Sequence, residues 1–90
     1  MPILRVKPSI FSDELKIQYT VPGDGSVKIN VYDITGREVM TLLNKIAKRG
    51  SYSLKWNGRT TEKRNLPGGV YFIRLEALGN PVTRKVILLR

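Results

Sequence analysis

The sequence predicts an all-β domain built as a β-sandwich, and three observations support this prediction. Apolar and polar residues alternate over most of the chain, which is typical of strands that bury one face. Gly, Pro, Asn and Asp interrupt the alternation at intervals of about 8 to 12 residues, as the turns of a sandwich do. A length of 90 residues allows one hydrophobic core, so residues 1–90 are expected to form a single domain.

The first part of the chain contains two clear strands. Alternation is strict over residues 15–21 (LKIQYTV) and resumes over residues 27–31 (VKINV), after the turn sequence PGDG at 22–25. A Gly-rich turn joins these strands, so they form either a hairpin or a short arch between two sheets. A short edge strand is expected over residues 3–6, which lie between two prolines.

The segment after the turn Asp-Ile-Thr-Gly is ambiguous. Its apolar residues recur at i, i+3, i+4 and i+7, the spacing of one helical face: Val39, Leu42, Leu43 and Ile46. A lone helix of about two or three turns is marginal in water, and Gly50 ends the segment. Periodicity therefore leaves two alternatives, a short helix or a strand followed by a loop.

The second half of the chain predicts three more strands, at residues 52–56, 70–75 and 82–89, with a polar loop over 59–65. The middle strand is apolar on both faces except for Arg74, as expected of a central strand buried on both sides. The total of about seven mostly antiparallel strands, together with the turn spacing, predicts an immunoglobulin-like β-sandwich.

The residues that most catalytic sites require are missing. The chain has no His and no Cys, which excludes the serine triad, the cysteine nucleophile and the common zinc sites. Asp13 and Glu14 are adjacent and project to opposite faces of a strand, so they are poorly placed as an acid/base pair. Asp24 and Asp33 are too few for calcium, which takes about six to eight oxygen ligands. We therefore expect a protein that is not an enzyme and that uses no cofactor or metal.

The net charge of +9 raises polyanions as partners: nucleic acid, anionic lipid or acidic polysaccharide. The basic residues are dispersed along the chain, however, and this favours solubility and protected sheet edges over a dedicated binding stripe. Tyr32 and Tyr71, near Arg37 and Arg74, form the one aromatic and basic grouping suited to stacking on bases, and core or edge packing is the favoured alternative for them.

Neither a membrane helix nor a leader is expected in these residues. The longest apolar run, residues 86–89, is far shorter than the ~20 residues that span a bilayer. The N-terminal residues lack the apolar region and the cleavage site of a signal peptide. If the domain is exported, the signal is expected on a longer parent chain.

Four ordered blocks of the sequence resemble the C-terminal sorting domains of the bacterial type IX secretion system. They are residues 27–39 (VKINVYDITGREV), 50–58 (GSYSLKWNG), 69–75 (GVYFIRL) and 83–90 (TRKVILLR). The usual Pro-Asn-Pro-Phe-like opening is replaced by KPSIF at 7–11. The Trp-Asn-Gly and Gly-Val-Tyr blocks also resemble the immunoglobulin-like domain of the flagellar hook-capping protein. Both families imply an immunoglobulin-like sandwich, with a strand over 38–43 and a loop over 44–49.

The resemblance to the sorting domains implies a non-catalytic module at the C-terminus of a longer secreted protein. It implies transport through the periplasm of a Gram-negative-type bacterium to the outer cell surface, with secretion-machinery proteins and anionic lipopolysaccharide as partners. No specific nucleic acid is expected to bind, and the isolated domain is expected to be a monomer. The candidate recognition residues are Gly69, Tyr71, Lys85, Leu88, Leu89 and Arg90.

The recognition role of these residues and the sorting function of the domain each have an alternative. Gly69 can simply start a strand, Tyr71 can pack in the core, and the last strand can complete a sheet. The resemblance to the hook-capping domain implies instead a structural assembly module, which acts through contacts between protomers of a larger protein.

Overall fold

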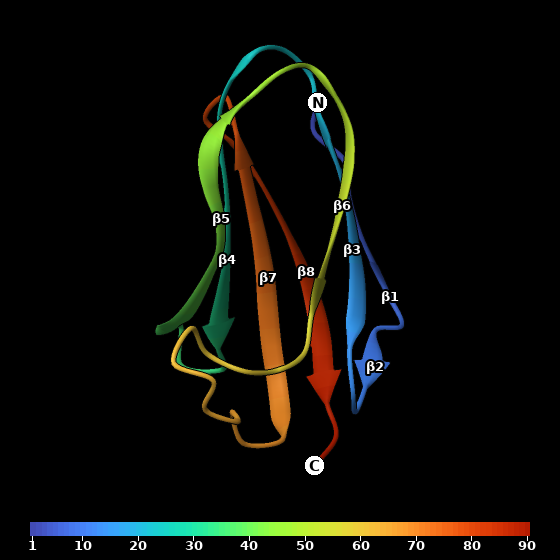
Figure 1. Cartoon of the computed structure of the whole chain (residues 1–90), viewed down its shortest axis with the longest axis vertical. Helices are drawn as coiled ribbons and strands as arrows, with labels where there is room; N and C mark the ends of the chain where they lie inside the picture. The colour runs from blue at the N-terminus through green and yellow to red at the C-terminus, as the bar shows by residue number, and fades with distance from the viewer.

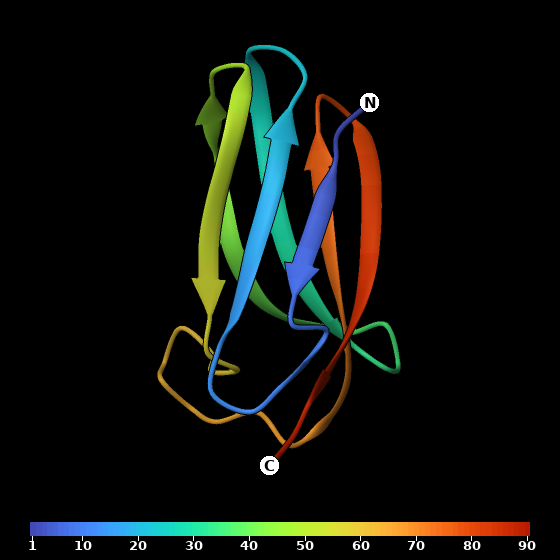
Figure 2. The ribbon, with the colours of Figure 1, turned by 90° about the vertical axis from the view of Figure 1, so that its right-hand side faces the viewer.

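Eight strands in two facing sheets account for the alternation in the sequence. The computed structural model describes all residues, 1–90. One sheet has the strand order β1-β3-β6 and the other β2-β8-β7-β4-β5; Figure 2 shows the smaller sheet in front of the larger one. The structure contains no helix of the length and hydrophobicity needed to cross a membrane. In chain order the strands are β1 (Leu4–Lys7), β2 (Ile10–Phe11), β3 (Leu15–Val21), β4 (Gly25–Asp33), β5 (Glu38–Ala47), β6 (Gly50–Trp56), β7 (Gly69–Ala77) and β8 (Asn80–Leu88).

This architecture confirms the predicted immunoglobulin-like sandwich, with eight strands where about seven are expected. The additional strand is β2, whose two residues pair in parallel with the end of β8. All other strand pairs are antiparallel. The turn at 22–25 carries the chain from β3 in one sheet to β4 in the other, as Figure 1 shows, so the arch is correct and the hairpin is wrong.

The core lies between the sheets and contains the residues that alternation places on the inner faces. It comprises 17 buried hydrophobic residues. Ile17 of β3, Ile29 of β4 and Ile73 of β7 are completely buried. Burial of each such side chain contributes about 1.5–3 kcal/mol relative to exposure in water. Because both sheets supply these residues, neither sheet is stable without the other.

Two bulges explain why the sequence of β5 resembles a helix. The register between β4 and β5 shifts twice, and the shifts leave one extra residue each in β5, Leu42 and Val39. Each bulge changes the phase of the alternation, so apolar residues recur three apart in an extended chain. The strand alternative is therefore correct. The loop predicted over residues 44–49 is wrong for 44–47, since β5 continues to Ala47.

The outer face of β7 differs from its prediction. Although β7 is central in its sheet, Val70, Phe72 and Arg74 are only half-buried, because no second layer covers that face. Tyr32 lies opposite Phe72 on the same face, whereas Tyr71 points into the core and is 4% exposed. Core packing, the favoured alternative, is therefore correct for Tyr71, and the grouping of two outward tyrosines with arginines does not form.

Candidate functional site

The candidate recognition residues converge at one end of the sandwich, with one exception. Gly69 begins β7 and lies opposite Leu88, the last residue of β8, so Leu89 and Arg90 leave the sheet at this end. Lys85 lies higher on β8, exposed and opposite Phe72 on the outer face. The structure thus brings together five of the six residues.

Arg90 ties the polar loop to the end of β8. Its Nη2 donates to the carbonyl oxygen of Gly58 at 2.8 Å, and its Nε donates to that of Leu66 at 3.0 Å. Gly58 has a φ of +75°, and a Cβ there would lie 2.9 Å from Nη2 and 3.1 Å from Leu88 Cδ1. Glycine adopts this left-handed backbone without strain and leaves room for Leu88 and the Arg90 side chain.

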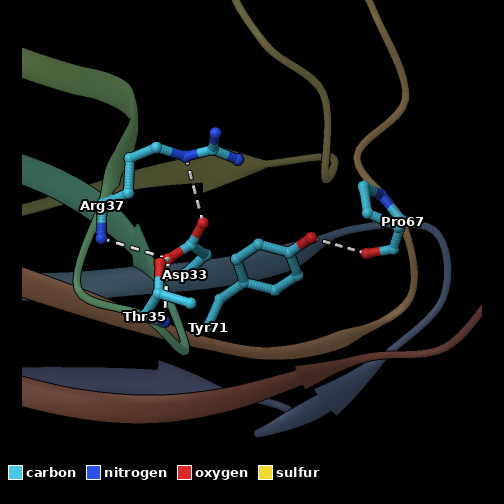
Figure 3. Close-up of polar contacts among 5 residues, drawn as sticks. All are labelled: Asp33, Thr35, Arg37, Pro67 and Tyr71. Carbon is cyan, nitrogen blue, oxygen red and sulfur yellow. Dashed lines mark hydrogen bonds and ion pairs between the residues drawn. The ribbon is translucent and has the colours of Figure 1, made fainter.

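Aromatic side chains fill the space under this loop. Trp56, at the end of β6, packs against Phe11 and against the edge of Tyr71, with ring centroids 5.6 and 6.0 Å away. The indole Nε1 donates to the carbonyl oxygen of Arg59 at 3.0 Å. The Tyr71 hydroxyl donates to the carbonyl oxygen of Pro67 at 2.6 Å, as Figure 3 shows. We call these residues, Trp56, Gly58, Pro67, Tyr71, Leu88 and Arg90, the C-terminal cluster.

Asp33 organises the turn beside this cluster. Its Oδ1 accepts hydrogen bonds from the Thr35 hydroxyl at 2.6 Å, the Thr35 N–H at 2.9 Å and the Arg37 N–H at 3.1 Å. Its Oδ2 forms an ion pair with Arg37 Nε at 3.2 Å (Figure 3). These interactions, with the Thr35 hydroxyl first, lower the pKa of Asp33. The carboxylate therefore stays ionised and holds the turn.

The electrostatics of Tyr71 follow from its position between Asp33 and Arg90. Burial, and to a lesser extent the negative charge of Asp33, raises the pKa of the Tyr71 hydroxyl, while the charge of Arg90 opposes the change. A tyrosine with a raised pKa remains a hydrogen-bond donor at neutral pH. Its chemistry here is to hold the Pro67 carbonyl.

The arrangement is suited to recognition by shape. A shallow groove of about 210 Å³ lies between the Asp33 turn and residues 66–70, and Tyr71 is part of its wall. No three His, Cys, Asp or Glu side chains lie together in a way that could hold a metal ion. The exposed candidates are Gly69, Lys85, Leu89 and Arg90, whereas Tyr71 and Leu88 are 4% and 1% exposed. A partner at this end would therefore meet Gly69, Leu89 and Arg90, and the buried Tyr71 and Leu88 hold the shape beneath them. Lys85 lies apart, on the outer face of β8.

The sequence alone did not identify the hydrogen-bond partners of Arg90 and Tyr71. The arginine and tyrosine bond to backbone carbonyls of Gly58, Leu66 and Pro67, and a carbonyl has no signal in the sequence. Only Asn-Gly at 57–58 and Pro-Gly at 67–68 mark the turns that present these carbonyls.

Two facing sheets closed at one end by an aromatic cluster define an immunoglobulin-like β-sandwich domain. The model of the FlgD Ig-like domain family matches residues 8–80, and the chain belongs to this family. No curated protein sequence matches the chain.

Solved structures with this fold include two proteins from Porphyromonas gingivalis. The chain is similar to dimeric latent PorU, with a TM-score of 0.75 and 18% identity over 99% of this chain and 9% of PorU. It is similar to PorZ, a surface component of the type-IX secretion system, with a TM-score of 0.64 and 17% identity over 97% of this chain and 11% of PorZ. At these identities the likenesses show the fold alone.

FlgD from P. aeruginosa is a third similar structure. Its TM-score is 0.58 and its identity 26%, over 84% of this chain and 60% of FlgD. The chain therefore spans a small part of PorU and PorZ and less than two thirds of FlgD.

Proposed function

We propose that this domain is a non-catalytic C-terminal sorting and anchoring module, which directs a secreted parent protein through the type IX secretion system to the cell surface. The likeness to PorZ, a surface component of the type-IX secretion system, carries the proposal, because it extends over 97% of the chain with a TM-score of 0.64. The likeness to PorU, over 99% of the chain with a TM-score of 0.75, supports the same fold. The four sequence blocks add motif similarity at residues 27–39, 50–58, 69–75 and 83–90.

In this proposal the secretion machinery recognises exposed residues at the C-terminal cluster together with Lys85 on the outer face of β8. Lys85 and Leu89 offer a charge and an apolar side chain, and Leu89 is 53% exposed. Tyr71 and Leu88 act indirectly, since they keep the end of the sandwich closed. After transport, attachment to anionic lipopolysaccharide retains the parent protein at the surface, and the net charge of +9 favours such a partner.

An export assay with point variants tests the proposal. Deletion of residues 85–90 is unsuitable because it removes Val86 and Leu88 from the core. We would fuse residues 1–90 to a periplasm-targeted fluorescent reporter in a bacterium that has the type IX machinery. The variant Lys85→Glu/Leu89→Ser is compared with Ile3→Ser/Lys28→Glu, which changes the same kinds of residue elsewhere, with Ile3 47% exposed.

We expect the wild-type and control fusions at the surface or in the medium, and the Lys85/Leu89 variant in the periplasm. Resistance to proteolysis establishes that each domain is folded. Retention of a folded wild-type fusion in the periplasm would contradict the sorting function. Export of the Lys85/Leu89 variant at the wild-type level would remove these two residues from the recognition surface.

A second candidate function is a structural assembly module of the hook-capping type. The family match over residues 8–80 and the 26% identity to FlgD favour it. Sedimentation velocity of the isolated domain discriminates between the two functions. A defined oligomer supports the assembly module, whereas a monomer at all concentrations supports the sorting module.

A further inference from the structure

The four free edges of the two sheets are not equivalent. The edge strands β1 and β2 have four and two residues. β5 has ten residues, but its two bulges break the regular row of backbone groups. β6 (Gly50–Trp56) pairs only with β3, in an unbroken register of seven residues. It is therefore the one edge strand that is both long and regular. The part of β8 that precedes its two-residue pairing with β2 is also unpaired on that side, but it carries Pro81 and the cations Arg84 and Lys85.

An edge strand directs the N–H and C=O groups of alternate residues away from its neighbour, so β6 presents an unpaired row of them. Tyr52 and Leu54 point inward from β6 and remain half-buried, because no strand lies beyond them. Ser51 and Ser53 on the other face are small. A further strand would pair with the backbone and cover Tyr52 and Leu54 without a steric barrier.

A groove beside this edge offers room for side chains. It has a volume of about 500 Å³ and separates β6 from β5, the other strand on this flank of the sandwich, which faces the viewer in Figure 1. Its apolar wall consists of Met40, Leu42 and Trp56. Side chains from one face of an added strand would enter this groove and bury apolar area.

The charges on the flank determine the kind of strand that fits. Three cations line the groove: Lys55, Arg59 and Lys63. The one carboxylate there, that of Glu14, forms an ion pair with Lys55 at 3.6 Å. Three more cations, Lys45, Lys48 and Arg49, lie near the opposite end of β6. The Asp24 carboxylate also lies at that end, where it accepts the Arg49 N–H at 2.8 Å. Cations therefore outnumber carboxylates at both ends of the edge.

We propose that the β6 edge, with the adjoining groove, binds an extended acidic segment of a partner protein by strand addition. Backbone hydrogen bonds supply the pairing, the groove takes alternate apolar side chains, and carboxylates near both ends of the segment meet the two groups of cations. A second copy of this chain is a poor occupant, because each copy carries a net charge of +9. The inference is independent of the sorting proposal.

Peptide binding to the whole domain tests the inference. The probe is the blocked peptide Glu-Val-Thr-Val-Thr-Val-Glu, and its counterpart carries Lys in place of both Glu. Titration followed by NMR gives the affinity, and amide hydrogen exchange shows which N–H groups become protected. The variant Lys55→Glu/Lys63→Glu is compared with Lys28→Glu/Arg84→Glu, which makes the same charge change on β4 and β8. Heparin serves as a polyanion without a peptide backbone.

We expect the acidic peptide to bind, to protect alternate amides of β6 and to lose about tenfold in affinity with the Lys55/Lys63 variant at low salt. The lysine peptide should not bind to the wild-type domain. The control variant Lys28→Glu/Arg84→Glu should bind the acidic peptide with the wild-type affinity. No binding of the acidic peptide to the wild-type domain would overturn the inference. Binding without protection of β6, matched by heparin, would overturn it in favour of general polyanion attraction. A dimer that protects β6 without any peptide would assign the edge to self-association.

Discussion

The C-terminal cluster and the β6 edge share a strand but differ in how the surrounding structure covers it. Trp56 and Leu54 both point inward from β6, two residues apart. Trp56 is 2% exposed because the polar loop, Phe11 and Tyr71 enclose it, whereas Leu54 is half-buried beside an unpaired edge. Alternation determines which way a side chain points, and the long loop determines how deeply it is buried.

The largest expected loss of stability comes from truncating Trp56, and the same truncation of Leu54 gives the comparison. Trp56→Ala should lower the free energy of unfolding by about 3–5 kcal/mol, because it opens a cavity between two aromatic rings and removes an indole hydrogen bond. Leu54→Ala should cost about 1–2 kcal/mol, since Leu54 is only partly removed from water. Urea unfolding of both variants measures the difference. Equal losses of unfolding free energy would show that enclosure of Trp56 by the loop adds nothing to stability.

A smaller effect compares two tyrosines that each donate to a carbonyl four residues earlier. Tyr71 donates to Pro67 at 2.6 Å inside the cluster, and Tyr52 donates to Lys48 at 2.5 Å on the exposed edge. Tyr71→Phe should cost about 1–1.5 kcal/mol, because the Pro67 carbonyl loses its partner. Tyr52→Phe should cost about 0.5 kcal/mol or less, since water replaces the hydroxyl at an exposed carbonyl. Thermal unfolding of the two variants at pH 7 gives the ranking.

The pH dependence provides a second check on Tyr71. Its pKa is raised in the folded state, so above the ordinary pKa of tyrosine the unfolded chain loses the proton first. The contribution of Tyr71 to stability is therefore complete below pH ~10 and declines as the pH rises through and above that value. Tyr71→Phe should flatten this decline. An unchanged alkaline profile would contradict the role of burial at Tyr71.

The smallest effect concerns the turn carboxylate. The lowered pKa of Asp33 means that its contribution to stability is present above the ordinary pKa of about 4 and is lost as the pH falls through the lower folded value. Asp33→Asn should weaken stability slightly at pH 7 and reduce the loss below pH ~4. Asp24→Asn is the matched change near β6, where the Asp24 carboxylate accepts one N–H, from Arg49. If Asp24→Asn changes the stability at acid pH as much as Asp33→Asn does, the three hydrogen bonds to Asp33 add no more stability than the one hydrogen bond to Asp24.

The sequence predicted the strands wherever alternation was undisturbed. β3, β4, β6 and β8 lie where the alternation placed them, and β7 lies where its apolar run placed it, because each buries one face on the same core. β5 was ambiguous because its bulges at Leu42 and Val39 shift the alternation, and only resemblance to known families favoured a strand. The two-residue strand β2 is too short for any periodicity, since its pairing depends on β8.

The candidate site was predictable only in part, for a related reason. Gly69, Tyr71, Leu88 and Arg90 were identified by motif similarity, but the contacts of Arg90 and Tyr71 are with carbonyls whose positions depend on the whole loop. The motif at residues 50–58 covers β6 but gives no sign that one edge of this strand is unpaired. The regularity of that edge is visible only when the register of all four edges is compared.

The pairing of β2 with β8 has a consequence for the order of events during synthesis or transport of the chain. It places Phe11 beside Leu88, so the first and last strands of the larger sheet are neighbours. Until β8 emerges, β7 lacks one neighbour, β2 has no partner, and the core lacks Val86 and Leu88. Contacts so distant along the chain form late and together. A chain that is synthesised from its N-terminus therefore lacks a complete core until β8 has been made, and the folded domain requires all eight strands.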